Sequence, residues 1–406
     1  MTALVTPLPA ASPRRSAAGG TPTSGHLRQV DVVRVITFAC VIGVHAISHT
    51  NGASRNAAVA GMLLHFTREV FFVLTGFVLF HAYARKPLRA STFWRRRSSL
   101  VLLPYLTWTL IYLEYSRAEW PTSVGWWHRF GYDLLTGNAE YHLYFLLVTL
   151  QIYLLFPLLL RVVRATRGHH GVLFAGALAV ELAETWALHG PGRGATGFAG
   201  AVVRQSGTLL PSYLFYVVVG ALAAVHLARW QQFVDRHRAA IFWFLTAAGV
   251  VTVWVHEAQI HSVADIGPAT DVLQPVMVLW SSAVAVALYA LGSRWVGRAP
   301  GARAIRILDE ASLISFGVYL AHPLLLQIFS DHWLGLGNGW ITAPASTILL
   351  VAVTVVSTTL VVETARRTTL SLALTGRPAA KKGATPAPEA SEEPGQKQVH
   401  RNPAPA

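Results

Sequence analysis

The chain has 406 residues, of which 53% are hydrophobic and 13% are charged, and its mean hydropathy is +0.44. This composition excludes an ordinary soluble globular protein and predicts a polytopic membrane protein. The formal net charge of +14 does not indicate nucleic-acid binding, because the basic residues fall in short clusters between apolar segments. Cys40 is the only cysteine, which excludes an internal disulfide and a thiolate metal cluster, and we expect it to be a packing residue.

Residues 1–27 are rich in Pro, Ala, Ser, Gly and Thr and are predicted to be a disordered cytoplasmic tail. The following residues, 28–365, alternate apolar segments with short polar loops, which predicts an all-α membrane domain of about ten transmembrane helices. The predicted spans are 30–48, 59–83, 100–115, 141–160, 171–187, 209–227, 239–255, 272–291, 312–329 and 342–362. Residues 366–406 are rich in Pro, Ala, Lys and Glu and are predicted to be a second disordered cytoplasmic tail.

The first predicted span carries ionisable side chains. Arg34 and His45 are eleven residues apart, which places them about 20° from the same helix face with a rise of about 16.5 Å. Charged groups at the centre of a membrane cost roughly 2.5 to 3.5 kcal/mol each, so a function is expected for those that persist. The alternative is that Arg34 reaches the membrane surface, or pairs with Asp31, while His45 makes a structural hydrogen bond. The same side of the helix also carries Asp31, Thr37, Ser48 and His49.

The distribution of Lys and Arg predicts the orientation of the chain. With the N-terminus in the cytoplasm, the inner loops carry sixteen basic residues and the outer loops carry five. Because this bias sets the orientation of membrane proteins, both termini are predicted to lie in the cytoplasm. Arg34 then lies near the cytoplasmic side of a cell membrane, and His45 lies near the outer side.

Five stretches, in chain order, resemble the membrane acyltransferase type 3 family. Members of this family carry an Arg-x10-His signature on the first span, and Arg34 and His45 have this spacing. The resemblance covers about residues 28–365. The other stretches are FFVLTGF at 71–77, FWRRRSSLVLLPYLTWTLIY at 93–112, YHLYFLLVTLQIYLLFPLLL at 141–160 and SFGVYLAHPLLL at 315–326.

One position departs from the family pattern. Many members carry an Arg-x-x-Arg pair directly before the proline of the third span. Here Val101 stands three residues before Pro104, and three arginines lie further upstream instead. This arrangement is closer to the branch that includes O-succinyl and O-acetyl transfer proteins of biofilm polysaccharide systems. The upstream arginines are Arg95, Arg96 and Arg97.

The resemblance implies transfer of an acyl group, most commonly acetyl, from cytoplasmic acyl-CoA to a hydroxyl of an envelope glycan or related acceptor. A sugar hydroxyl needs a general base to attack a thioester, and histidine is suited to that task, so His45 is the predicted base. Arg34 would position the pantetheine arm or polarise the thioester. No metal is expected. The chain contains no nucleophilic serine elbow, Gly-rich phosphate loop or zinc-binding His-Glu motif, which favours direct transfer.

The remaining candidates have structural alternatives. The arginines at 95–97 suit the phosphates of acyl-CoA, because guanidinium groups bind phosphate in a bidentate manner, but they would also anchor the chain to anionic membrane lipids. His142, His322, Glu69 and Glu181 are predicted to line the acceptor site. Each is also a candidate for a hydrogen-bonded packing residue between neighbouring helices.

Two other functional classes compete with the enzyme. A transporter or glycan-export subunit would use Arg34, His45 and Glu181 as a substrate or proton path, although no inverted repeat is visible in the sequence. A non-catalytic membrane scaffold would tolerate alanine in place of His45. The sequence does not reveal the acceptor, the acyl chain length or the oligomeric state.

Overall fold

The computed structural model describes residues 26–51, 54–116, 123–262, 266–333 and 342–379. Within these ranges the chain forms helices and no strands, as predicted. The α-helices are α1 (Arg28–Asn51), α2 (Arg55–Leu64), α3 (Thr67–Tyr83), α4 (Ala90–Tyr115), α5 (Val124–Thr136), α6 (Tyr144–Ala165), α7 (His170–His189), α8 (Gly197–Gln205), α9 (Leu214–Val225), α10 (Leu227–Arg236), α11 (Arg238–Gln259), α12 (Ile266–Ala269), α13 (Pro275–Gly297), α14 (Ala302–Ile328), α15 (Ala345–Ala365) and α16 (Ser371–Thr375). Short helical turns are η1 (Pro191–Gly194), η2 (Ser206–Thr208), η3 (Leu210–Tyr213) and the π-helical η5 (Phe329–Trp333).

Nine helical segments of the described chain are long and apolar enough to cross a membrane. They correspond to nine of the ten predicted spans, and the fold class is confirmed as an all-α polytopic membrane protein. The tenth predicted span, 100–115, lies in α4. This part of α4 contains Pro104, Glu114 and several tyrosines, which make it less apolar than the other spans.

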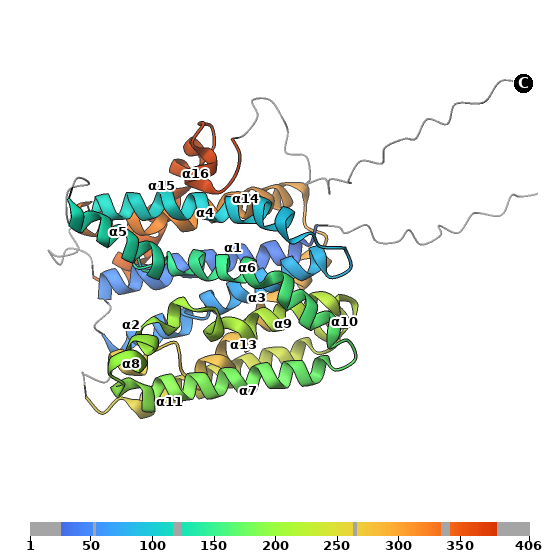
Figure 1. Ribbon diagram of the computed structural model, residues 1–406. Coiled ribbons are helices and arrows are strands. Elements are labelled where there is room, and N and C mark those ends of the chain that lie inside the picture. Colours follow the sequence, from blue (N-terminus) through green and yellow to red (C-terminus); the bar gives the residue numbers. More distant parts are fainter. Residues whose placement is uncertain (1–25, 52–53, 117–122, 263–265, 334–341, 380–406) are drawn as a thin grey trace, which may run out of the picture.

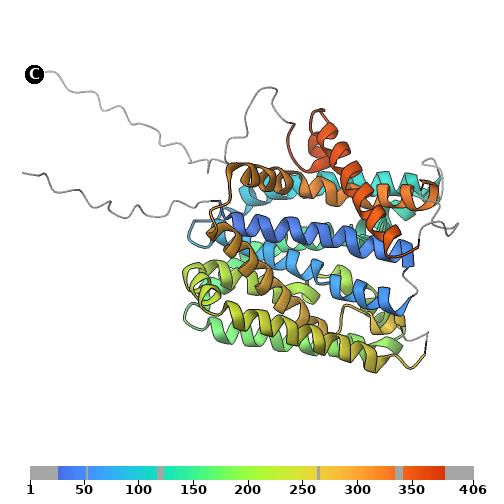
Figure 2. The ribbon, with the colours of Figure 1, turned by 180° about the vertical axis from the view of Figure 1, so that it is seen from behind.

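The long helices run roughly side by side (Figures 1 and 2). Helix α1 lies inside this bundle and packs against α3, α13, α14 and α15. Helices α4, α14 and α15 lie on one side of it, whereas α7 and α11 lie on the other. Because neighbours surround α1, its polar face meets protein rather than lipid.

Helices α3 and α9 approach each other closely at two glycines. A Cβ on Gly76 would lie 2.3 Å from the carbonyl oxygen of Val217, and a Cβ on Gly220 would lie 2.0 Å from that of Val73. Small residues at such crossings let helix backbones touch, which is a common way to pack helices in a membrane. This contact holds α3, and with it the Arg68–Glu69 end of that helix, against the rest of the bundle.

The predicted boundary of the C-terminal tail is wrong for residues 366–379. This segment forms α16 and packs against α4, α14 and α15. Ser371 is fully buried and Thr375 is 2% exposed. The Pro-, Ala-, Lys- and Glu-rich composition behind that prediction belongs to the residues after 379, whereas 366–379 carry three leucines and small hydroxyl side chains that fit between three helices. Most of the predicted disorder, in 1–25 and 380–406, lies outside the described residues.

Candidate active site

A first cavity, the arginine cavity, has a volume of about 380 Å³. It is lined by Arg34 of α1, Arg97 of α4 and Arg377, which follows α16, and its described lining contains no carboxylate. Most of the remaining lining is apolar, with a few hydroxyl side chains. An anionic ligand with a slender, largely apolar arm fits this combination of charge and surface.

Arg34 is held beside this cavity by two side chains. Its Nη1 donates to Oδ1 of Asp31 at 3.3 Å and lies 3.0 Å from Oγ of Ser312. Ser312 in turn donates to the same carboxylate oxygen at 2.7 Å. The structural pairing with Asp31 that the spacing predicts is therefore present, and it orients Arg34 without removing it from the cavity wall.

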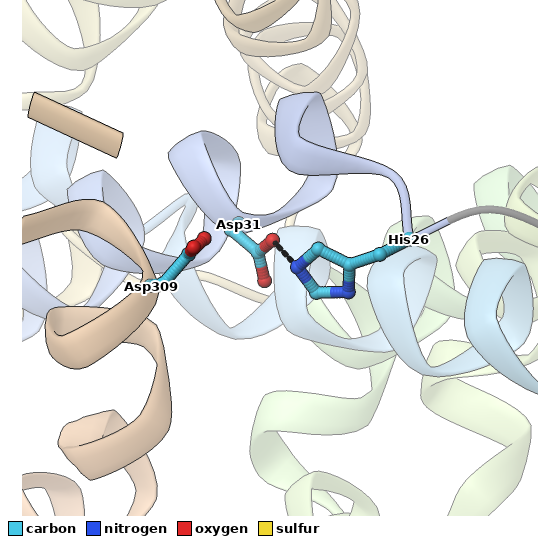
Figure 3. Close-up of side chains that lie close together, drawn as sticks. All are labelled: His26, Asp31 and Asp309. Carbon is cyan, nitrogen blue, oxygen red and sulfur yellow. Dashed lines mark ion pairs between the residues drawn. The ribbon is translucent and has the colours of Figure 1, made fainter. Parts of the chain in front are cut away.

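The other oxygen of Asp31 contacts His26, whose Nε2 lies 2.6 Å from Oδ2 (Figure 3). Asp309 of α14 faces the same place, and one ligand atom from each of the three side chains lies within 4.8 Å of the others. Asp309 also pairs with Arg28 at 3.7 Å. Arg34 and Ser312 donate to one oxygen of Asp31, and His26 lies against the other, so Asp31 serves as an anchor for Arg34. The expectation that no metal is needed stays a prediction.

A second cavity, the histidine cavity, has a volume of about 230 Å³ and contains His45 and His142 in its lining. The ring of His45 lies 4.1 Å from that of Tyr141 and 5.6 Å from that of His322. The rings of His142 and His322 are 5.4 Å apart. Three histidines predicted from separate parts of the sequence therefore meet at one place, supplied by α1, the turn before α6 and α14.

Hydrogen bonds orient this cluster. The Nδ1 of His322 donates to the backbone carbonyl of Tyr319 at 2.7 Å, which leaves its Nε2 as the nitrogen with the lone pair. The hydroxyl of Tyr319 donates to the backbone carbonyl of His142 at 2.7 Å. Among the described residues, neither ring nitrogen of His142 has a hydrogen-bond partner, nor does Nε2 of His322. Buried polar atoms without partners are rare, so these nitrogens mark a place for a polar ligand or water.

The two cavities are neighbours. Phe71 and Phe145 line both of them, and their rings lie 5.5 Å apart. Phe38 of α1, which lies between Arg34 and His45 in sequence, contacts Phe71 at 4.4 Å. A thin barrier of aromatic side chains thus separates a basic cavity from a cavity that contains histidines.

Of the other predicted site residues, some line a cavity and others do not. Of the arginine triplet, Arg97 is half-buried and lines the arginine cavity, whereas Arg95 and Arg96 are exposed. Glu69 is buried and pairs with Arg68 at 2.5 Å, and Arg68 lines the histidine cavity. Glu181 of α7 is 2% exposed and lies within electrostatic reach of this pair. Neither glutamate lines either of the two cavities.

Several lining residues were not singled out from the sequence. Arg377 falls in the predicted tail, and His65 lies at the break between α2 and α3, inside what the sequence predicts as one span. Tyr141 and Tyr319 lie within the family-like stretches at 141–160 and 315–326, so those motifs could have identified them as candidate site residues. Nothing in the sequence around Arg377 indicates its position.

The model of the acyltransferase 3 family, described as an acyltransferase domain, matches residues 27–362, which include α1 through most of α15. No curated protein and no solved structure matches the chain. Since the match covers more than half of the sequence, the chain belongs to the acyltransferase 3 family of membrane acyltransferases.

Proposed function

We propose that this protein is an O-acyltransferase that moves an acyl group, expected to be acetyl, from acyl-CoA to a hydroxyl of an envelope glycan or related acceptor. One observation carries the proposal. Arg34 and His45 lie on one helix, each lines a different cavity, and the two cavities share Phe71 and Phe145. A donor in the arginine cavity would therefore present its thioester close to the base in the histidine cavity.

The chemistry assigns a role to each cavity. The guanidinium groups of Arg34 and Arg97 suit the phosphates of acyl-CoA, and the apolar lining suits the pantetheine arm. The acceptor oxygen attacks the carbonyl carbon of the thioester while neutral His45 takes the hydroxyl proton. The carbon–sulfur bond then breaks, and CoA leaves as a thiolate that takes up a proton. His142 and His322 hold the base and the acceptor in place.

The predicted orientation in the membrane is consistent with a donor site in the arginine cavity and an acceptor site in the histidine cavity. Sixteen basic residues in the predicted inner loops, against five in the outer loops, favour a cytoplasmic location for both termini in a cell membrane. The arginine cavity would then open toward cytoplasmic acyl-CoA, and the histidine cavity would take its acceptor from the outer side. Anionic lipid would contact the exposed Arg95 and Arg96.

The test is transfer of radiolabelled acetyl from acetyl-CoA into envelope fractions, using membranes with equal amounts of wild type or variant. His45→Ala is expected to lower labelling by about 10² to 10⁴-fold, the range for loss of a general base. The matched control is His49→Ala on the same helix, whose exposed ring contacts Ser330 and lines neither cavity.

Each result is informative. Labelling by wild type and the His49 variant but not by the His45 variant supports the proposal and identifies the acceptor fraction. Equal labelling by the His45 variant overturns the assignment of the base. If wild type transfers no acyl group from acetyl-CoA or from longer acyl-CoAs, the donor is wrong, and movement of a glycan or lipid-linked substrate across vesicles becomes the next measurement.

A further inference from the structure

The arginine cavity includes three residues from outside the part of the chain that matches the family. Gly376, Arg377 and Pro378 line it, whereas the family match ends at residue 362. A short segment after the last long helix thus returns to the bundle and forms part of the cavity wall.

Specific hydrogen bonds hold this segment in place. The indole Nε1 of Trp108 in α4 donates to the backbone carbonyl of Leu374 at 3.0 Å. The hydroxyl of Ser371 donates to the backbone carbonyl of Arg377 at 2.8 Å, and Ser371 is fully buried. The position of Arg377 is therefore set by α4 and by the turn that follows α16.

The turn at Gly376 brings the segment against both neighbouring helices. Its φ of +68° is in the left-handed region, which glycine adopts without strain. A Cβ at this position would lie 2.5 Å from the ring of Phe316 and 3.1 Å from the backbone carbonyl of Leu100. Only glycine fits between α4 and α14 here, so the turn brings the next residue, Arg377, to the cavity.

The charges at the cavity indicate what Arg377 meets there. Three arginines, Arg34, Arg97 and Arg377, line the cavity, and none of its described lining residues is acidic. Arg34 pairs with Asp31, which does not itself line the cavity. A cluster of guanidinium groups around one space calls for a ligand with several negative charges, and phosphates match their planar fork of donors.

We propose that residues 371–378 form one wall of the donor site and that Arg377 binds a phosphate of acyl-CoA. This inference rests on the proposed function, since it takes acyl-CoA to be the donor. It adds that the donor site is incomplete without a segment beyond the family-matched residues. Arg377 is a binding residue in this proposal and takes no part in the acyl-transfer step.

The test is direct binding of CoA and of pantetheine, which lacks the phosphates, to the purified full-length protein in lipid nanodiscs. Arg377→Ala is expected to weaken CoA binding by about 10-fold and to leave pantetheine binding unchanged, because a lost charge-assisted hydrogen bond affects only the phosphate-bearing ligand. Arg377→Lys is expected to restore part of the affinity. Arg367→Ala, at an exposed arginine ten residues earlier that does not line the cavity, is the control.

The outcomes separate the two proposals. If wild type binds CoA and Arg377→Ala binds it equally well, the role of Arg377 is wrong and the proposed function stands. Equal weakening of CoA and pantetheine would also overturn it, since that result indicates a distorted cavity rather than a lost phosphate contact. If wild type binds neither ligand, both proposals fail. Membrane abundance and thermal unfolding of each variant show that the compared proteins are folded.

Discussion

Arg34 and His45 lie eleven residues apart on one helix, yet they line two different cavities that meet at Phe71 and Phe145. In the proposed reaction, this relationship lets one membrane helix serve both the donor and the acceptor. Arg34 is tied to Asp31 and Ser312 at one end, and His45 contacts Tyr141 and lies beside His322 at the other.

Arg34→Lys is expected to lower acetyl transfer by about 10-fold or more, although it keeps the charge. A lysine ammonium lacks the planar fork of donors with which Arg34 can contact Asp31 and a ligand together. The measurement is the transfer rate as a function of acetyl-CoA concentration. Arg28→Lys, on the same helix and half-exposed, should leave the rate unchanged. A normal rate for the Arg34 variant would show that only charge matters at this position.

Phe71→Leu and Phe145→Leu are expected to change the choice of acyl chain. Both rings lie between the cavities, so a smaller side chain leaves room for a longer acyl group next to His45. The ratio of butyryl to acetyl transfer should rise by about tenfold, as expected for a pocket that gains methylene-sized space.

The control for this experiment is Phe156→Leu. Phe156 is fully buried in α6 but lines neither cavity, so this variant has a similar loss of packing without a wider passage. An equal change of the butyryl-to-acetyl ratio in all three variants would refute the role of the aromatic barrier.

Gly220→Ala is expected to destabilise the bundle by about 1 to 3 kcal/mol, because the added methyl group would overlap the backbone carbonyl of Val73 and force α3 and α9 apart. The measurement is thermal unfolding in detergent. Gly131→Ala in α5 is the control, since nothing lies within 4 Å of its Cβ position. If both variants unfold at the wild-type temperature, the close approach of α3 and α9 is not important for stability.

The half-buried carboxyl of Glu140 is expected to make the stability of the protein depend on pH. It lies between α5 and α6, where burial raises the pKa of its carboxyl, opposed by a hydrogen bond from the backbone N–H of Tyr141. A raised pKa means that the folded state holds the proton more tightly than the unfolded state. Its contribution is therefore favourable at low pH and is lost as the pH rises from the ordinary glutamate range through the raised pKa.

The measurement is the unfolding temperature of wild type and Glu140→Gln between about pH 4 and pH 7. The unfolding temperature of Glu140→Gln minus that of wild type should increase as the pH rises across this range. Glu310→Gln, at an exposed glutamate of α14, is the control for general charge effects. A constant difference between wild type and the Glu140 variant would contradict the prediction.

The sequence by itself determined the features that depend on local order. Apolar segments of membrane-spanning length predicted the all-α class, and nine of the ten spans correspond to described helices of sufficient length and apolarity. The helical repeat placed Arg34 and His45 on one face, because that depends only on their spacing within a single helix. The predicted roles of both residues await the experiments above.

Tertiary structure alone decided which distant residues join them. His142, in the turn before α6, and His322, in α14, come from parts of the chain far from α1, and their meeting with His45 depends on how these segments pack. Local pattern likewise does not distinguish the half-buried Arg97 from its two exposed neighbours. The place of Arg377 depends on the hydrogen bonds of Trp108 and Ser371 to this segment and on the fit of Gly376 between α4 and α14. Such contacts arise from packing between segments far apart in the chain, which no local periodicity records.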